Sequence, residues 1–443
     1  MLQFPFPGLV PPRQCRRRVR LVATAFAAWL AASVAAPGQG PDPGAVLEQA
    51  RARLRAVARG LDNYVCVETL DRGYYGRVAA GGETPSGGWQ LESTDRARLE
   101  VTVSRGRELH SWPGATRFDS RDVDELIRDG PVSTGAFGAY LAGVFDNPSI
   151  AFQFNGERSA HGKTAFEYGY RVPVGASRFQ IKVGTAWRAA AYEGEFRIDP
   201  QSLDLEQMTV RTSQLPPGAA FLQAGATLDY QHVRIGAGDV LLPRQSQLEI
   251  LLPGGRETRN TVAFSSCREY RAESEIVYDA PPETESAAVP RAGRGRVALP
   301  IGLPVTLALA APIDTAAAAA GDPVEAKVVK PVRRPESKED LIPAGAVARG
   351  RIRRVEHHLL PTPYFLIAMS FNRVEIQGVI FPFVARSEPD ADRARELGVN
   401  LAVRESGVWS WGVGTFLFPT GKSRMAIPAG SESQWFTLAT GGR

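Results

Sequence analysis

The chain has 443 residues, of which 44% are hydrophobic, and a formal net charge of +5. That positive excess equals the contribution of five arginines near the N-terminus: Arg13, Arg16, Arg17, Arg18 and Arg20. The rest of the chain is therefore nearly neutral, which argues against a nucleic-acid-binding protein. A length of about 400 residues without the N-terminal segment suits two domains, each able to bury its own core.

Residues 1–35 have the pattern of a secretory signal peptide. The basic cluster precedes an apolar run, Leu21–Val34, which ends in small residues. This run is shorter than the roughly 20 residues that cross a bilayer, and Cys15 lies before it, where a lipid-attached cysteine would have to follow it. We expect cleavage near Ala35 or Ala36 and a periplasmic or extracellular protein with no transmembrane span in the mature chain. An uncleaved membrane anchor is the alternative.

The first element of the mature chain is predicted to be an amphipathic helix. Asp42 supplies an N-cap and Pro43 the first turn, and apolar residues then recur at three- and four-residue spacing as far as Leu61. We expect the helix to end near Gly60 and to pack on a sheet. Its polar face is either solvated or a site for acidic lipid, and it carries Glu48, Arg51, Arg53, Arg55 and Arg59.

Two strands, two short helices and a loop are predicted next. The strands are Tyr64–Leu70 and Leu99–Val103, separated by a Gly-rich loop, Ala79–Gly88, and the helices are Asp122–Arg128 and Thr134–Phe145. Three aromatic residues flank the loop: Tyr74, Tyr75 and Trp89. Aromatic residues beside a loop either bind sugars or lipids or cover a sheet. The sequence leaves both interpretations open.

The segment from Ile150 to Tyr278 alternates apolar and polar residues in short runs, as an antiparallel sheet does. We expect a loop at Asn155–Lys163 and turns at Asp199–Ser202 and Pro253–Gly255. The side-chain parity changes between Leu205 and Met208 and between Tyr230 and Val233, which predicts β-bulges. Because bulges curve a sheet, we expect one concave face.

Removal of the signal peptide leaves two cysteines, Cys66 and Cys267. In an oxidising compartment disulfides persist, so we predict a Cys66–Cys267 bond between the first and last strands of this sheet. Two separately buried thiols are the alternative.

The first half of the chain resembles a known class of protein. A helix beginning at Pro43, a strand beginning at Asn63 and a strand pair spanning Ala191–Val210 around Asp199 and Pro200 are similar to the half-barrel of periplasmic lipoprotein-carrier and lipoprotein-sensing proteins. The resemblance implies a curved sheet closed by helices around an apolar cavity that holds acyl chains. The helices within Asp122–Phe145 depart from a minimal carrier, and in the alternative interpretation they fill the cavity.

Residues 280–296 are rich in Pro, Ala, Glu, Ser and Gly and are predicted to be a linker. A second domain follows at 297–440, beginning with a strand pair, Val297–Leu309, that Pro304 interrupts. Three features then follow in the sequence of this domain: Gly321-Asp322-Pro323-Val324, Ile342-Pro343-Ala344-Gly345, and the strand Phe365–Ile376 paired with Val379–Val384. This order resembles the C-terminal β-barrel of conjugation-channel scaffold proteins from type IV secretion systems.

Those scaffolds carry a long apolar insert that crosses the outer membrane, whereas the corresponding run here, Val408–Phe418, is about half a membrane-spanning helix. The sequence therefore does not support a pore. Four aromatic side chains of this region either dip into a membrane surface or form a buried hairpin: Trp409, Trp411, Phe416 and Phe418.

The sequence shows no pattern of a reactive centre. None of the five histidines has the spacing of a tetrahedral metal site, and the neighbours His357 and His358 point to opposite faces of a strand. The carboxylates Glu193 and Glu195 share one strand face, where such residues usually face solvent. We predict no catalytic, cofactor or metal-binding residue and no enzymatic activity, and the ligand-binding residues stay unknown.

The predicted fold is mainly β: a curved antiparallel half-barrel with a few helices, residues 42–279, linked to a second, small β-barrel-like domain. We expect an exported cell-envelope protein that binds a lipid or lipoprotein segment in the first domain and an envelope protein partner through the second, without a nucleic-acid partner. The alternative is a structural or assembly module with no ligand cavity. An extracellular hydrolase with an unrecognised site is the third interpretation.

Overall fold

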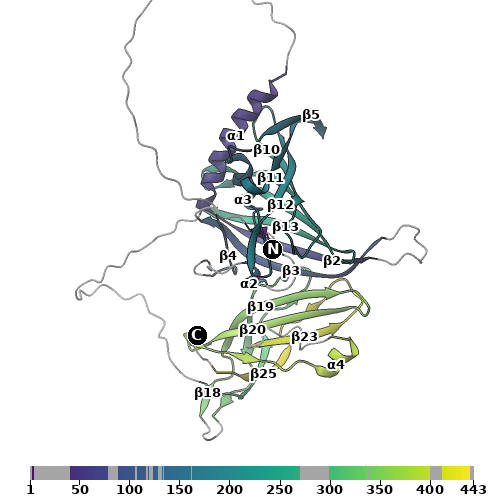
Figure 1. Cartoon of the computed structure of the whole chain (residues 1–443). Coiled ribbons are helices and arrows are strands. Elements are labelled where there is room, and N and C mark those ends of the chain that lie inside the picture. The colour runs from purple at the N-terminus through teal and green to yellow at the C-terminus, as the bar shows by residue number, and fades with distance from the viewer. Residues whose placement is uncertain are drawn as a thin grey trace, which may run out of the picture.

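The computed structural model describes residues 2–3, 40–77, 88–104, 107–115, 118, 123–127, 132, 134–160, 162–269, 299–334, 336, 339–399 and 412–439. Within this part of the chain the fold is mainly β, with two antiparallel units that follow each other in sequence (Figure 1). We call them the first module and the second module. The predicted fold class is thus confirmed. The predicted signal peptide, apart from residues 2–3, and the predicted linker lie outside the described residues.

The first module is one curved antiparallel sheet of ten strands. In spatial order these are β5 (Phe152–Ala160), β6 (Lys163–Val172), β9 (Ala191–Ile198), β10 (Leu205–Gln214), β11 (Gln223–Ile235), β12 (Gly238–Leu252), β13 (Arg256–Glu269), β2 (Tyr64–Arg77), β3 (Trp89–Ser104) and β4 (Arg107–Ser111). The pairing of β13 with β2 places the last strand beside the first. A separate hairpin, β7 (Gln180–Val183) and β8 (Ala186–Ala189), also pairs with β1 (Leu2–Gln3).

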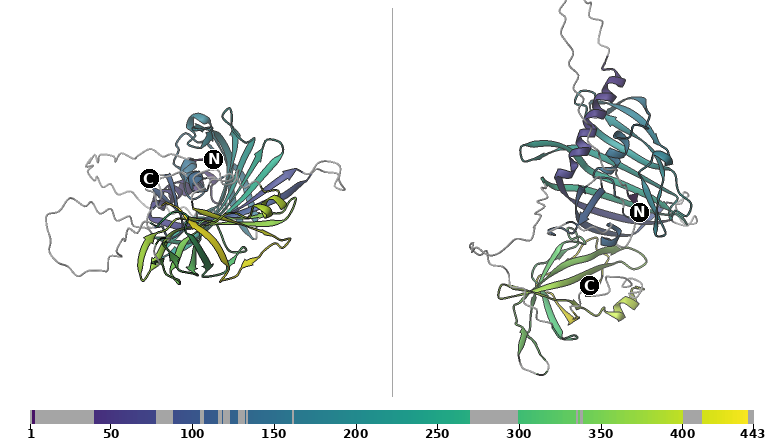
Figure 2. Two further views of the ribbon diagram at one scale, coloured as in Figure 1. Left: turned by 90° about the horizontal axis from the view of Figure 1, so that it is seen from below. Right: turned by 60° about the vertical axis from the view of Figure 1, so that its left-hand side comes forward.

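Helices cover the concave face of this sheet. The long helix α1 (Pro43–Gly60) begins as predicted, with the carboxylate of Asp42 accepting a hydrogen bond of 2.8 Å from the backbone N–H of Ala45. It crosses the concave face (Figure 2) and buries one side against the sheet. The shorter elements are the 3-10 helices Leu61–Asn63 and Val174–Ala176 and the helices α2 (Val123–Leu126) and α3 (Ala139–Phe145).

The bulges that curve the sheet lie close to the predicted positions. The register of β10 against β9 shifts between Leu205 and Gln207, and that of β11 against β12 shifts between Asp229 and Tyr230. The predicted loop at Asn155–Lys163 is wrong, because β5 continues to Ala160. A further bulge after Phe154 resets the side-chain parity there, so the alternation in the sequence breaks although the strand does not.

A disulfide links Cys66 in β2 to Cys267 in β13, the pair that the sequence analysis selects. Their Cα atoms are 4.0 Å apart, because the two strands are neighbours in the sheet. The bond joins residues separated by 201 positions in the chain. It therefore connects the first and last strands of the sheet.

The second module is a small barrel. Antiparallel pairings run from β22 (Ala385–Arg386) through β25 (Glu432–Thr437), β14 (Pro304–Leu309), β16 (Pro323–Val328) and β19 (Val347–His358) to β20 (Tyr364–Ile376). β20 pairs further with β21 (Val379–Pro382) and with β23 (Val413–Pro419), and the chain passes from β21 directly to β22. The remaining elements of this module are β15 (Ile313–Asp314), β17 (Val332–Arg333), β18 (Asp340–Ile342), α4 (Ala391–Glu396) and β24 (Ala426–Ile427).

The predicted strand pair at the start of this module is wrong in part. In its described part, residues 299–309, one strand forms, and it begins at Pro304, whose missing N–H is tolerated at a strand start. The predicted hairpin of Phe365–Ile376 with Val379–Val384 is present, with Gln377 and Gly378 at positive φ in the two-residue turn. Trp435 is fully buried at the centre of the barrel core.

Both modules meet at β3, where β19 pairs with it through Glu356–Asp95, His357–Thr94 and His358–Ser93. Figure 1 shows β19 running beside β3. The backbone N–H of Arg98 donates to the carbonyl of Ala320 at 2.7 Å, and Ala320 donates back to Arg96 at 2.9 Å. The two modules have separate hydrophobic cores. We propose that each is a folding unit, joined along β3 to the other.

Gly321 lies at this junction and has no room for a side chain. Its φ is +104°, and a Cβ atom would lie 2.3 Å from the carbonyl oxygen of Arg98. We expect Gly321→Ala to lower the free energy of unfolding by about 2–4 kcal/mol, through overpacking and backbone strain together. The matched control is Gly302→Ala, with φ of +80° and nothing within 4 Å of its Cβ. Equal losses for both variants, measured by denaturant unfolding, would show that the junction is loosely packed.

Candidate functional site

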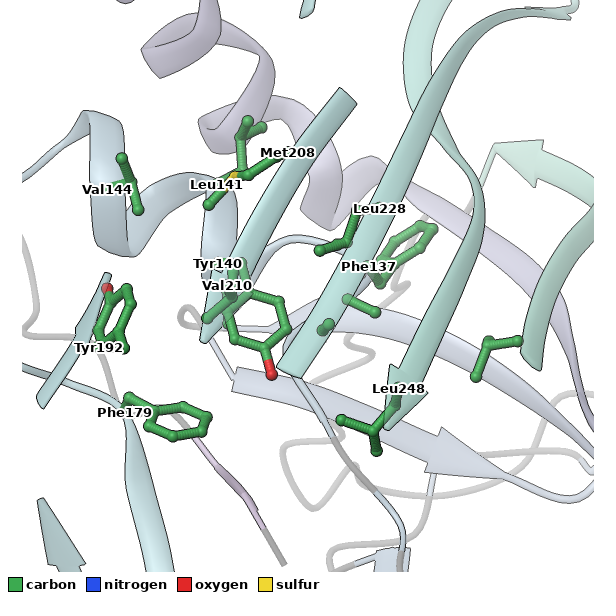
Figure 3. Close-up of a cluster of buried hydrophobic side chains, with 14 of the residues drawn as sticks. Phe137, Tyr140, Leu141, Val144, Phe179, Tyr192, Met208, Val210, Leu228 and Leu248 are labelled. Carbon is green, nitrogen blue, oxygen red and sulfur yellow. The ribbon is translucent and has the colours of Figure 1, made fainter. Parts of the chain in front are cut away.

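The concave face of the first module is filled at its centre. Residues 137–145 place five side chains there, each at most 1% exposed: Phe137, Tyr140, Leu141, Val144 and Phe145. They pack in one continuous cluster (Figure 3) against Phe179, just before β7, and against five strand residues: Tyr192, Met208, Val210, Leu228 and Leu248. Side chains of the protein itself therefore occupy the centre of the concave face. This agrees with the alternative interpretation of the helices within Asp122–Phe145, in which they fill the cavity.

The arginines of α1 hold the inserted helix in place. Arg55 donates to the carbonyl of Phe145 at 2.8 Å, and Arg51 donates to Phe145 at 3.2 Å and to Asn147 at 2.9 Å. The carbonyls at the end of α3 lack partners within the helix, so these bonds satisfy them. Arg53 pairs with Asp204 at 2.8 Å. The polar face of α1 thus contacts protein at these residues, instead of being only solvated or free for acidic lipid.

A buried group of charged side chains anchors the other end of the insert. The carboxylate of Glu108 accepts hydrogen bonds from the backbone N–H groups of Gly135 at 2.6 Å and Gly138 at 2.9 Å. Burial nevertheless raises the pKa of Glu108. His110 lies two residues further along β4, with its Nε2 atom 3.2 Å from Glu68. Burial alone lowers the pKa of His110, but the carboxylates of Glu68 and Glu108 outweigh it and raise that pKa.

This pairing predicts that stability depends on pH. Because the pKa of His110 is higher in the folded state, the stabilisation is fully present below about pH 6.5 and is lost as the pH rises through the folded value. One proton contributes a slope of at most about 1.4 kcal/mol per pH unit. We expect His110→Gln to remove this contribution from the pH dependence of the free energy of unfolding between pH 6 and 9. A variant with the wild-type slope would contradict the assignment.

An aromatic patch at the edge of the sheet exposes Phe154, whereas Phe166 and Tyr168 beside it are buried. Phe154 on β5 is 40% exposed, and its ring lies 5.4 Å from Phe166 and 5.5 Å from Tyr168. On the same strand Phe152 lies under the guanidinium of Arg51, 5.2 Å from its ring centre. The patch is the outermost part of the aromatic cluster that continues inward through Phe196.

A polar trough of about 970 Å³ crosses the outer face of the sheet, from β5 to β12. Glu193 lies in it between Arg171 at 3.0 Å and Arg211 at 2.9 Å. Glu195 accepts a hydrogen bond of 3.3 Å from Asn155. The two carboxylates thus face outward on one strand, as expected, and two arginines neutralise Glu193.

A second cleft, of about 620 Å³, lies where the outer face of the first module meets the second module. We call it the junction cleft. β2, β3, β12 and β13 supply one side, and β19, β20 and the segments near Thr315 and Arg424 supply the other. Gln247 and Glu249 line both the trough and the junction cleft, so the two hollows adjoin.

His357 and His358 take separate places, as the alternation of a strand requires. The ring of His357 stacks on Phe365 at 4.1 Å and lines the junction cleft. The Nε2 atom of His358 lies 2.7 Å from Glu356, and its ring stacks on Tyr364. Burial, together with His358, lowers the pKa of His357, so this imidazole is neutral at pH 7.

The aromatic residues that flank the Gly-rich loop have different environments. Tyr75 lines the junction cleft, and Arg259 lies 4.7 Å from its ring centre. Tyr74 donates a hydrogen bond of 2.9 Å to Asp95, which also pairs with Arg72 at 2.6 Å. Trp89 is 38% exposed at the start of β3. Of the three, Tyr75 is the one that lines the junction cleft.

The apolar run near the C-terminus is described from Gly412 onward, so Trp409 and Trp411 lie outside the described residues. Phe416 and Phe418 belong to β23 and pack against the core of the second module, with Phe416 6.1 Å from Trp435. No helix in the described ranges is long and apolar enough to span a membrane. Among the described residues, no group of three or more His, Cys, Asp or Glu side chains is placed to hold a metal ion.

No protein-family model matches the chain, and no curated protein matches it. Its fold is similar to that of a LolA superfamily protein from Nitrosomonas europaea, with 8% identity and a TM-score of 0.26, over 52% of this chain and 97% of that chain. It is also similar to a candidate outer membrane lipoprotein-sorting domain from Vibrio parahaemolyticus, with 10% identity and a TM-score of 0.25, over 51% and 93%.

A DUF1329 family protein from Desulfovibrio piger is similar at 10% identity and a TM-score of 0.25, over 50% of this chain and 92% of that chain. Each of the three likenesses concerns the fold and covers about half of this chain. The resemblance of residues 297–440 to conjugation-channel scaffolds stays a prediction.

Proposed function

We propose that the protein is an exported, non-enzymatic binding protein of the cell envelope that acts through its polar outer surfaces and not through an acyl-filled cavity. The observation that carries this proposal is the burial of α3 against the concave sheet, with all seven of its residues buried. An acyl chain at that place would have to displace side chains already packed to the density of a core. A protein partner bound by the second module is part of the same proposal.

The envelope location rests on the predicted signal peptide and on the Cys66–Cys267 disulfide. Disulfides persist outside the reducing cytosol. Both observations support export to a periplasmic or extracellular compartment.

Transport or sensing of a lipid or lipoprotein segment is the second candidate function, and the exposed Phe154 patch favours it. An acylated segment on the exposed ring of Phe154 would bury apolar surface without entering the core. The two candidate functions predict different amounts of acyl lipid in the purified protein, and this amount is simple to measure.

The experiment is organic extraction and mass spectrometry of the mature protein purified from the envelope of a Gram-negative host. We expect far less than one acyl-bearing molecule per chain, because the side chains of residues 137–145 fill the centre of the concave face. About one bound acyl lipid or lipoprotein per chain would overturn the first proposal and support the second. N-terminal sequencing of the same sample should begin near residue 36, and a sequence beginning at Met1 would contradict cleavage of the exported form.

A further inference from the structure

The junction cleft is built from groups of both modules and has the size of a small-ligand pocket. Asp71, Tyr75 and Arg259 come from the first module, and His357 and Arg424 come from the second. Its ligand would therefore contact both sides of the β3–β19 junction. Nothing in the proposed function so far gives this cleft a role.

The charges of the cleft nearly balance. Arg96 pairs with Asp71 and also donates to the carbonyl of Ala316 at 2.5 Å, and Arg259 pairs with Glu257 at 2.5 Å. Within the described residues, the side chains of Arg424 and Glu249 make no hydrogen bond or salt bridge, although Glu249 acts electrostatically on Arg259 across β12 and β13. Cationic and anionic side chains thus nearly offset each other in the cleft, which leaves no strong field for a polyanion, and the polar lining does not suit an acyl chain.

Two ring systems give the cleft flat apolar surfaces. Tyr75 presents one ring, and His357, stacked parallel to Phe365 with 9° between the planes, presents the other. The Nε2 atom of His357 is buried and has no hydrogen-bond partner, so this neutral imidazole contributes its ring, and not that nitrogen, to the cleft. Hydroxyl and amide side chains, among them Thr261 and Gln247, complete the lining.

We propose that the junction cleft binds a neutral saccharide of the cell envelope. A sugar ring has an apolar C–H face that packs on aromatic rings, and hydroxyl groups that both donate and accept hydrogen bonds. The cleft offers this combination with little net charge. Since Gln247 and Glu249 continue into the trough, a longer oligosaccharide has a polar path across the outer face. The inference rests on the proposed function in one respect, that the saccharide comes from the cell envelope.

The test uses the full mature protein on an array of bacterial envelope saccharides, followed by calorimetric titration with the sugars that bind and with an N-acetylglucosamine tetramer. Tyr75→Ala and Arg424→Ala should each weaken binding about tenfold, because they remove a stacking surface and an exposed hydrogen-bond donor. The matched control is Trp89→Ala, an exposed aromatic residue at the start of β3 and outside the cleft lining. It should bind like the wild type.

If the folded wild-type protein binds none of the neutral saccharides, the inference is overturned. Binding that persists unchanged in both cleft variants would overturn its location. Binding of an extended-peptide library that Tyr75→Ala and Arg424→Ala abolish, without sugar binding, would assign the cleft to a polypeptide instead. Because the assay uses purified protein, a failure of export or the discovery of a bound acyl lipid leaves its result unchanged.

Discussion

Replacing Cys66 and Cys267 together by alanine is expected to lower the free energy of unfolding by up to about 5 kcal/mol. The bond closes a loop between residues separated by 201 positions. On the chain-entropy model, opening so long a loop gives the unfolded chain many more conformations, which favours unfolding. Because β2 and β13 are neighbours in the sheet, the folded state needs no rearrangement to keep them together.

Denaturant unfolding of the wild type and the double variant measures this loss. Reduction of the wild type should lower its stability by a similar amount and leave the double variant unchanged, which provides the control. The three cysteines of the chain are Cys15, Cys66 and Cys267, so a thiol titration of the mature protein reports on this pair alone. Two free thiols per unfolded, unreduced mature chain would contradict the bond.

Phe145→Ala is expected to lower the free energy of unfolding by about 3–5 kcal/mol, the usual cost of removing a buried phenylalanine from a core. Its ring is fully buried, 4.9 Å from Phe196 in an edge-to-face contact and stacked on Phe152 at 6.1 Å. If the concave face were an open cavity, truncation there would cost much less.

Phe154→Ala is the matched control, since it removes the same side chain from an exposed position on β5. We expect it to cost about 1 kcal/mol or less, as surface substitutions usually do. Equal effects of the two substitutions would contradict the core role of α3.

The fold of the first module was predictable because its pattern is local. Capping by Asp42 and Pro43 defines α1, and apolar residues at every second position, such as Phe166, Tyr168 and Tyr170, define β6. The pattern failed at Asn155–Lys163, because a bulge after Phe154 interrupts the alternation within a strand. Pairing of β3 with β19 was beyond prediction, since no local pattern marks which edge a strand from another module will join.

The candidate site was predictable only in fragments. Tyr75 and His357 were both singled out, one as an aromatic residue beside a loop and the other as half of a histidine pair, but 282 positions in the chain separate them. The β3–β19 pairing brings them to one cleft. In the same way, the arginines of α1 were visible as a basic face, whereas their acceptors at the end of α3 depend on the packing of the insert.

Amide hydrogen exchange of residues 139–146 tests most directly whether α3 is a permanent part of the core. Ala142 and Asp146 donate helical hydrogen bonds of 3.1 Å within the buried insert. We predict that these amides exchange as slowly as those of β9 and β10, with or without an excess of a triacylated peptide. Fast exchange of α3 in the free protein, or faster exchange when the acylated peptide is added, would show that the helix leaves the concave face and would contradict this account.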